Sequence, residues 1–431
     1  MKDQFDLVVV GAGPGGLAAA ATAVEAGMRV CLVDDNPACG GQIWRGAVGN
    51  EVSSGPASRW LTRIDRHAEM RTGWRVVAAP VAQTLRVEHE GDAQDIRYSA
   101  LVLATGAREL FLPFPGWTLP GVCGAGGLQA FVKSGFDIAG KRVVIAGTGP
   151  LLLAVAAGLH KAAARVEAIV EQAPFSRLAR FGFRLLGGHA GKLAEGAEYG
   201  WITRGTRYNW GAWVSEAAGH GRVEQVTITS RSDKRTIKTD MLAVGFHLVA
   251  NTELADLLNC RIDDGLVQVD ALQETSVKGV YAVGEVTGIG GVDKALIEGQ
   301  IAAFAASGQP RKAEALMRSR SREVRFALEL EAAFALRDEL RRLAREDTLV
   351  CRCEDVPHGE LHVRRSWREA KLHTRCGMGP CQGRICGPAT RFLYGWNSPQ
   401  PRPPLFPADV ATLIGPVADE IEEDATTKAE K

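Results

Sequence analysis

The stretch "DLVVVGAGPGGLAAAATAVEAGMRVCLVDD", residues 6–35, decides the fold of the N-terminal part of this chain. Leu7–Val10 is a short apolar run typical of a buried parallel strand, and Ala18–Ala26 is a helix of small residues that can press against a sheet. A second apolar strand, Arg29–Val33, ends in Asp34. The order strand–glycine loop–helix–strand predicts a Rossmann-like dinucleotide-binding unit.

The loop of this unit places Gly11, Gly13 and Gly16 in G-x-G-x-x-G spacing. Glycines at these positions let backbone N–H groups approach a pyrophosphate at the N-terminus of the helix, where the helix dipole favours anions. Asp34 can accept a hydrogen bond from a ribose hydroxyl. A lone glycine motif is a weak signal, but the two strands, the helix and the terminal acid together make a strong one.

The composition is that of a globular protein with two or three domains. Among 431 residues, 46% are hydrophobic and 23% charged, and 51 lysines and arginines balance 50 acids. This balance argues against binding of nucleic acid. No basic segment precedes the first strand, and glycines interrupt the uncharged stretch after it, so we expect a cytoplasmic protein without a membrane span. The nine cysteines are then metal ligands, catalytic thiols or core residues.

A second, altered nucleotide loop lies in "KRVVIAGTGPLLLAVAAGLHKAAARVEAIVE", residues 141–171. Gly147 and Gly149 are loop glycines and Glu171 ends the next strand, but Leu152 stands where the third glycine is expected. That glycine normally permits close packing of helix and strand. The site is therefore a working NAD(P)H site, a site for another adenine nucleotide such as ATP, or an empty structural domain. Leu152 favours a site for another adenine nucleotide or an empty structural domain over a working NAD(P)H site.

Five cysteines gather near the C-terminus. Cys351 and Cys353 form a C-x-C pair, 27 residues follow, and Cys381 and Cys386 form a C-x-x-x-x-C pair, with Cys376 five positions before Cys381. Soft thiolate ligands suit zinc or an iron–sulfur cluster, and a C-x-C pair is tight for structural zinc. The flavin-side cysteines are isolated from one another in sequence, which disfavours disulfide-reductase chemistry.

The cysteine spacing resembles the small helical 2Fe–2S domain of the bacterioferritin-associated ferredoxin type. The resemblance implies that Cys351, Cys353, Cys381 and Cys386 are the ligands of the cluster. Cys376 is then a spare thiol, although it could replace Cys381.

Three further stretches resemble signatures of flavoproteins with two dinucleotide domains: "GGQIWR" (40–45), "LVLATGARE" (101–109) and "TSVKGVYAVGE" (275–285). The resemblance implies FAD in the first site. Glu285 stands where that family more often has aspartate, and its longer side chain can still reach the cofactor. The residues that the resemblance adds to the FAD site are Gly41, Gln42, Arg45, Thr105, Gly106, Gly284 and Glu285.

Taken together, the motifs resemble the alpha (A) subunits of heteromeric opine oxidases or dehydrogenases, D-hydroxyproline and L-proline dehydrogenases and hydrogen cyanide synthase. The resemblance implies a beta subunit of the D-amino-acid-oxidase fold that oxidises the amine, FMN at the subunit interface, and a quinone or cytochrome as acceptor. Any association with a membrane would then come through these partners. This chain would transfer electrons, and we assign it no catalytic residue.

Two alternatives stay open. The chain could be an NAD(P)H-dependent flavin and iron–sulfur oxidoreductase, or a structural assembly subunit that merely holds nucleotides. The expected fold class is α/β, with two Rossmann-like domains and a small helical domain. The expected domains are FAD-binding (1–112 and 245–311), NAD-binding-like (113–244), a helical spacer (312–347), the 2Fe–2S domain (348–397), and an extended arm and tail (398–431).

Overall fold

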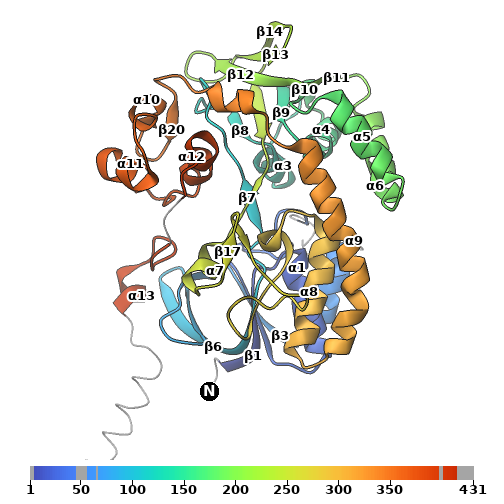
Figure 1. The fold of residues 1–431 in the computed structure, drawn as a ribbon, viewed down its shortest axis with the longest axis vertical. Coiled ribbons are helices and arrows are strands. Elements are labelled where there is room, and N and C mark those ends of the chain that lie inside the picture. The colour runs from blue at the N-terminus through green and yellow to red at the C-terminus, as the bar shows by residue number, and fades with distance from the viewer. Residues whose placement is uncertain (1–3, 45–55, 65–66, 398–400, 415–431) are drawn as a thin grey trace, which may run out of the picture. The chain divides into compact units, whose positions relative to one another are not determined.

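The computed structural model describes residues 4–44, 56–64, 67–397 and 401–414 (Figure 1). The chain divides into two compact units. Unit 1 comprises residues 1–107, 250–327 and 400–431, and unit 2 comprises residues 108–249 and 328–399. The acidic C-terminal tail and Arg45 lie outside the described residues.

Unit 1 is built on a seven-stranded sheet with the order β3-β2-β1-β6-β5-β4, and β19 also pairs with β6. Strands β1, β2, β3, β6 and β19 are parallel, whereas β4 and β5 join them as an antiparallel hairpin extension. The strands are β1 (Gln4–Val10), β2 (Val30–Asp34), β3 (Ala68–Thr72), β4 (Arg75–Ala78), β5 (Thr84–His89), β6 (Asp92–Leu103) and β19 (Val280–Ala282). Two short strands, β17 (Ile262–Asp263) and β18 (Leu266–Val267), pair separately.

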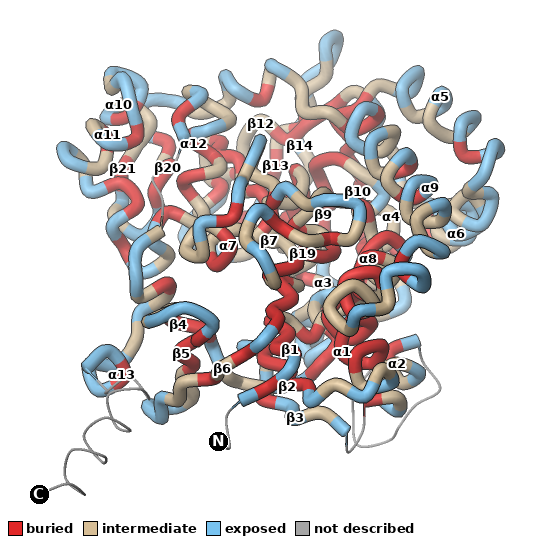
Figure 2. The backbone as a smooth tube through the Cα atoms, turned by 60° about the horizontal axis from the view of Figure 1, so that its bottom comes forward, coloured by how far each residue is buried: buried red, intermediate tan, exposed pale blue. Residues whose placement is uncertain are grey.

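Successive side chains of β1 point to opposite faces of the sheet, so unit 1 has a hydrophobic core on each face. Most residues of β1 are buried (Figure 2). Val8 and Val10 belong to one core and Leu7 and Val9 to the other. The second core includes alanines of helices α1 and α8. The helical elements of unit 1 are α1 (Pro14–Glu25), α2 (Pro56–Ile64), α7 (Glu253–Leu257), η1 (Gly284–Thr287), α8 (Val292–Ala306) and α13 (Val410–Ile414).

Helices α1 and α8 pack closely because both have glycine at the crossing. A Cβ on Gly299 would overlap the carbonyl oxygen of Gly15. Helix α1 begins at Pro14, earlier than the Ala18 expected from the sequence. Proline is favoured in the first turn because its missing N–H has no intrahelical partner there.

Unit 2 contains a five-stranded parallel sheet, order β11-β10-β9-β15-β8, and an antiparallel sheet, order β12-β13-β14. The strands of unit 2 are β8 (Val122–Gly124), β9 (Arg142–Gly147), β10 (Arg165–Glu171), β11 (Arg207–Trp210), β12 (Ala212–Ala218), β13 (Gln225–Ser230), β14 (Lys234–Lys238), β15 (Met241–Gly245), β20 (Leu349–Cys351) and β21 (Val356–Pro357). Its helices are α3 (Ala125–Lys133), α4 (Leu151–Lys161), α5 (Phe175–Leu185), α6 (Ala190–Ile202), η2 (Asp338–Arg342), α10 (His358–Leu361), α11 (Trp367–Thr374) and α12 (Cys386–Tyr394).

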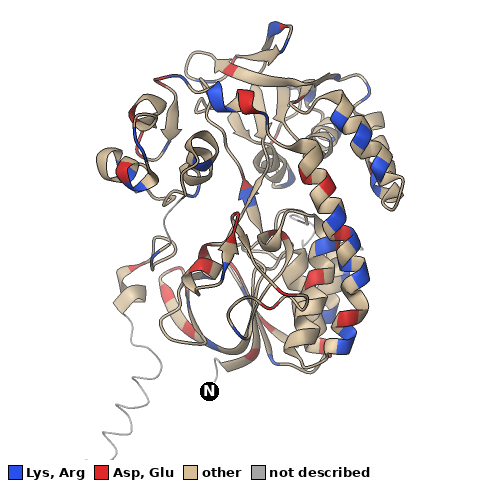
Figure 3. Cartoon of the chain, in the orientation of Figure 1, with Lys and Arg blue, Asp and Glu red and all other residues tan. Residues whose placement is uncertain are grey.

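Within the described residues, the chain passes between the units through two short strands and one long helix. Strands β7 (Ala107–Glu109) and β16 (Leu248–Ala250) pair with each other. Helix α9 (Pro310–Phe334) begins in unit 1 and ends in unit 2, and basic and acidic residues are interspersed along its ribbon (Figure 3). The two parallel sheets, each with a glycine loop after a central strand, confirm the expected α/β class.

The proline-rich segment after the cysteine region returns to unit 1. Leu405 is buried in the core that contains Val8, and its N–H donates to Val77 O at 2.8 Å. The guanidinium of Arg75 lies 4.9 Å from the centre of the Phe406 ring. Residues 401–414 therefore pack on the strands of unit 1.

Candidate functional site

Of the three glycines in the first loop, Gly13 borders open space in which a ligand could lie, whereas Gly11 and Gly16 are packed against backbone. Gly11 has φ +107°, and a Cβ on it would overlap the Ala104 carbonyl. A Cβ on Gly16 would overlap the carbonyl of Gly11, so both glycines are needed for backbone packing. A Cβ on Gly13, by contrast, would meet nothing within 4 Å.

Helix α1 follows this loop with free N–H groups. Gly13 is its N-cap, and no side chain caps the helix. The first N–H groups of a helix have no partner within the helix and are suited to bind an anion. The open space at Gly13 and these donors fit a dinucleotide pyrophosphate.

Asp34 lies beside the loop, as the sequence predicts, and is buried. Its Oδ1 accepts from the backbone N of Asn36 at 2.7 Å and from Asn36 Nδ2 at 2.8 Å, and its Oδ2 accepts from Ala12 N. A carboxylate offers about four acceptor positions, so one position remains for a ribose hydroxyl.

The predicted flavin-side loop folds back onto the first glycine loop. Gly40 N donates to Ala12 O at 2.8 Å, and a Cβ on Gly41 would lie 3.0 Å from Gly13 Cα. Gln42 is exposed. The structure thus brings Gly41 to Gly13, whereas Arg45 lies outside the described residues.

The turn at Thr105 and Gly106 is fixed by Asn251, a residue that the sequence analysis did not identify. The Thr105 hydroxyl donates to Asn251 O at 2.6 Å, and Asn251 Nδ2 donates to Thr105 O at 2.9 Å. Asn251 N also donates to Gly106 O at 3.0 Å. The Thr105 side chain therefore has its proton engaged within the protein and acts on the shape of the turn.

Glu285 is partly buried and turned toward its own loop. Its Oε2 accepts from Gly290 N at 2.7 Å and its Oε1 from Gly291 N at 3.0 Å. Burial raises the pKa of this carboxyl group, and the two N–H donors oppose the rise. The carboxylate thus holds the turn that precedes α8.

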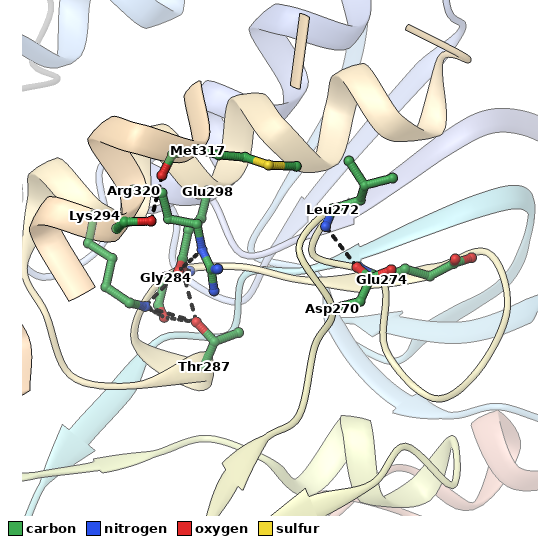
Figure 4. Close-up of polar contacts among 10 residues, drawn as sticks. Asp270, Leu272, Glu274, Gly284, Thr287, Lys294, Glu298, Met317 and Arg320 are labelled. Carbon is green, nitrogen blue, oxygen red and sulfur yellow. Dashed lines mark hydrogen bonds and ion pairs between the residues drawn. The ribbon is translucent and has the colours of Figure 1, made fainter. Parts of the chain in front are cut away.

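A buried ionic network supports the neighbouring Gly284 (Figure 4). Glu298 accepts from Lys294 Nζ at 2.8 Å and from Arg320 Nε at 3.1 Å. Gly284 N donates to Glu298 at 3.0 Å, and Lys294 Nζ donates to Gly284 O at 2.9 Å. Gly284, with φ +79°, is therefore held at both its N–H and its carbonyl group.

The second glycine loop differs at its acid. Glu171 Oε1 accepts from Thr148 Oγ1 at 2.8 Å and from Ala173 N at 2.7 Å, and its Oε2 accepts from Gly149 N at 2.8 Å. Glu171 is 0% exposed, and burial raises its pKa to about 7. Leu152, a residue of α4, is also fully buried and packs in a core with residues of β9 and β10.

Three thiols converge in the C-terminal region. The Sγ atoms of Cys351, Cys376 and Cys386 all lie within 4.8 Å of one another, and all three residues are buried. Cys351 ends β20, Cys376 follows α11, and Cys386 begins α12. The cysteine spacing predicts Cys376 as a spare thiol, but the structure places it with two of the predicted ligands.

The other two predicted ligands form a neighbouring pair. The side chain of Cys353 is hydrogen-bonded to that of Cys381, and it also accepts from the backbone N of Cys381. Cys353 is exposed and Cys381 is partly buried. All four predicted ligands and Cys376 thus belong to one small region of unit 2.

Hydrogen bonds to Cys351 stabilise a thiolate there. S–H groups of Cys376 and Cys386 donate to it and lower its pKa to about 2, with help from the backbone N–H groups of Gly377 and Glu354. The pKa of Cys376 is raised to about 12, mainly because its proton is shared with Cys351. Thiolates are the form that binds soft metals, so the donor set fits a thiophilic metal centre.

Glycines of the "GMGP" motif give this region its close packing. A Cβ on Gly379 would overlap Cβ of Cys353, and one on Gly377 would lie 2.5 Å from the indole ring of Trp367. Gly377 also has φ +79°. Larger residues at either position would move the segments that carry the thiols.

The remaining cysteines carry no comparable signal. Burial raises the pKa of Cys39 to about 11 and that of Cys123 to about 12, and Cys31 is a core residue of β2. Cys260 lies in the same core as Cys31, where its Sγ contacts Thr275 Oγ1 at 3.4 Å. Three of these thiols are buried and Cys123 is partly buried. None of the helices within the described ranges combines the length and the hydropathy needed to span a bilayer.

Comparison with known proteins identifies the class. The family model for pyridine nucleotide-disulphide oxidoreductases matches residues 5–308. Because the match covers most of the chain, the protein belongs to this family of Rossmann-like flavoproteins. Membership implies FAD, which the geometry at Gly13 accommodates.

Two proteins that are subunits by name are similar to this chain over most of its length. Hydrogen cyanide synthase subunit HcnB of Pseudomonas aeruginosa is 33% identical over 88% of this chain and 90% of the relative. The opine oxidase A subunit of Rhizobium meliloti is 32% identical over 97% of this chain and 99% of the relative. These matches confirm the resemblance drawn from the motifs, and both relatives are subunits of larger enzymes.

Solved structures support the fold. L-proline dehydrogenase from P. horikoshii superposes with a TM-score of 0.65 at 18% identity, over 95% of this chain and 79% of that chain. T. acidophilum thioredoxin reductase gives a TM-score of 0.54 at 22% identity, over 71% of this chain and 98% of that chain. At these identities the comparison establishes architecture alone.

Proposed function

We propose that this chain is the electron-transfer subunit of a heteromeric flavin and iron–sulfur amine dehydrogenase of the opine oxidase type. The observation that carries the proposal is the convergence of Cys351, Cys376 and Cys386 in a chain that belongs to a flavoprotein family. When bound, FAD exchanges two electrons and can release them singly, whereas a 2Fe–2S cluster carries one electron at a time.

In this proposal the first loop holds FAD. The N–H groups at the start of α1 bind its pyrophosphate, Asp34 binds a ribose hydroxyl, and Gly41 closes over Gly13. The turns at Thr105 and Gly284 are held by Asn251 and Glu298, so that the backbone beside the cofactor keeps one shape.

The proposed ligands of the cluster are Cys351, Cys353, Cys381 and Cys386. Cys376 lies against the buried two of these, so it either ligates in place of Cys381 or donates a hydrogen bond to a ligand sulfur. Hydrogen bonds to cluster sulfurs tune the reduction potential. Four thiolates also suit zinc, which is why the metal must be identified directly.

The amine would be oxidised in a separate subunit of the D-amino-acid-oxidase fold, with FMN at the interface. The similarity to HcnB and to the opine oxidase A subunit supports a partner subunit. Electrons would leave to a quinone or a cytochrome. A cytoplasmic location, with membrane association only through partners, remains part of this proposal.

The decisive experiment is anaerobic co-purification of the chain with its partner, followed by flavin extraction and metal counting. We expect FAD, about two irons per chain and little zinc. Flavin reduction should require both an amine substrate and the partner. Reduction by NADH alone would favour the NAD(P)H-dependent alternative, and bound flavin that no donor reduces would favour a structural assembly subunit.

Matched variants test the ligand assignment. Cys386→Ser should lose iron and the visible absorption of the cluster while FAD stays bound, because the first glycine loop, where we propose FAD binds, and the thiols belong to different units. Cys123→Ser, a partly buried thiol on β8 of the same unit, is the control and should keep both. Full iron content in Cys386→Ser, or zinc in the wild-type protein, would contradict the proposal.

A further inference from the structure

The second nucleotide loop is covered by a distant part of the same unit. Residues 333–337, at the end of α9 and just after it, lie against Thr148, Gln172 and Ala173, the neighbours of Glu171. Glu171 and Gln172 are both 0% exposed. An acid that ends the second strand of a Rossmann unit normally meets the adenosine ribose of a bound dinucleotide.

We infer that residues 333–337 permanently close the ribose end of the second site, so that this chain binds neither NAD(P)H nor ATP there. The domain then serves to anchor the end of α9, from which the chain leads through η2 to the cysteine cluster.

The first line of support is the Phe334 carbonyl group. Its oxygen accepts from His247 Nε2 at 2.9 Å, and Gln172 Nε2 lies 3.3 Å away. Thr148 Oγ1 is also 3.3 Å away, but its single proton is directed at Glu171 Oε1 at 2.8 Å. Phe334 is the last residue of α9, and the last carbonyl groups of a helix have no partner within it. Side chains of the nucleotide domain therefore cap this helix.

Gln172 fastens the chain that follows. Its Nε2 also donates to Ala335 O at 3.2 Å, and its Oε1 accepts from Arg337 N at 3.1 Å. The Arg337 guanidinium stacks on Trp213 at 4.9 Å and pairs with Glu339. Gln172 is thus hydrogen-bonded on both its amide atoms to the covering segment.

Apolar packing completes the closure. Ala173, Ala333 and Phe334 form a small buried cluster, and the Phe334 ring meets that of Phe181 edge-on at 5.6 Å. Phe334 is only 6% exposed. Thr148 Oγ1, which donates to Glu171, lies 3.3 Å from the Phe334 carbonyl oxygen, so a ribose at Glu171 would have to displace the covering segment.

Burial and helix polarity also oppose a dinucleotide. Glu171 accepts three hydrogen bonds, from Gly149 N, Ala173 N and Thr148 Oγ1, as many as Asp34 accepts, but Glu171 is 0% exposed whereas Asp34 is 7% exposed. The C-terminal end of a helix carries partial negative charge, so the end of α9 disfavours phosphates nearby. A Cβ on Gly149 would meet nothing within 4 Å, which shows that the closure concerns the ribose end of the site.

His247, which donates to the Phe334 carbonyl group, has a strained backbone conformation. Its φ is +137°, a conformation that costs a non-glycine residue about 1–3 kcal/mol. Burial lowers its pKa, so the ring is neutral, and Nε2 must carry the proton because a carbonyl oxygen can only accept. The strained residue supplies the shortest hydrogen bond to the Phe334 carbonyl group.

The test is titration of the FAD-saturated protein, whose first site is already filled, with NADH, NADPH and ATP by calorimetry. We expect no saturable binding up to about 1 mM, which corresponds to an affinity weaker than about 4 kcal/mol. Leu152→Gly, which restores the third loop glycine, should bind no better because the covering segment remains. Saturable binding of any of these nucleotides to the wild-type protein would overturn the inference.

A second measurement tests the closure without any ligand. Gln172→Ala removes the acceptor of the Arg337 N–H, so hydrogen exchange of that amide should accelerate by about tenfold or more. Gln225→Ala, at an exposed position of β13, is the control and should change nothing. Unchanged exchange at Arg337 in Gln172→Ala would show that Gln172 does not hold the segment. Iron counting is independent of both results, so failure here leaves the proposed function standing.

Discussion

Glu298→Gln should loosen the turn beside the proposed flavin site. Glu298 is 0% exposed and Lys294 is 3% exposed, so the substitution leaves a buried ammonium without its counter-ion. Breaking one partner of a buried ion pair costs about 3–5 kcal/mol. Gly284 N, Lys294 Nζ and Arg320 Nε all donate hydrogen bonds to the native carboxylate. The glutamine side chain has an NH₂ group in place of one carboxylate oxygen, and this group cannot accept from these donors.

Hydrogen exchange of the α8 amides measures this loss locally, without the assumption that the whole chain unfolds in one step. We expect exchange about 10²–10⁴-fold faster, the equivalent of about 3–5 kcal/mol. Glu314→Gln, at an exposed position of α9, is the matched control and should change the free energy of local opening of α8 by less than about 0.5 kcal/mol.

The double substitution Lys294→Met with Glu298→Gln separates the charge from the packing. Removing the stranded ammonium should recover part of the loss, because a buried pair is costly mainly when only one partner remains. An acceleration below about tenfold in Glu298→Gln would refute the reasoning, since the pair would then contribute no more than a surface ion pair.

Three other changes have defined outcomes. Gly13→Ala should fold but lose most FAD, because its methyl group fills space that is open in the protein; flavin content against circular dichroism checks this. Gly379→Ala should displace Cys353 and reduce the bound metal several-fold. The control Gly205→Ala, with nothing near its added Cβ, should retain the metal. A full metal content in Gly379→Ala would contradict the packing argument. Glu171 has a folded pKa raised from 4.5 to about 7, so unit 2 should lose about 3 kcal/mol of stability as the pH rises between these values. Glu171→Gln should abolish that loss, as measured by urea unfolding at pH 5 and pH 8.

Local patterns were sufficient to predict both Rossmann units. Hydrophobic runs, loop glycines and terminal acids at Asp34 and Glu171 are adjacent in sequence, and their hydrogen-bonded geometry follows from short-range backbone constraints. The same holds for the cysteine spacing, which indicated a thiol site. Helix α1 began earlier than expected because a proline in the first turn outweighs the low helix propensity of the following glycines.

Tertiary structure alone decided which groups meet across long separations. Cys376 joins Cys351 because two short elements fold over glycines that have no room for a side chain. Asn251 holds the turn at Thr105 from 146 residues away, and Phe334 covers a loop 186 residues earlier. Sequence by itself determined the two nucleotide loops and the thiols, since these depend on neighbouring residues. Whether a loop stays open or is closed depends on packing between segments that no local pattern relates, so it was settled only by the folded chain.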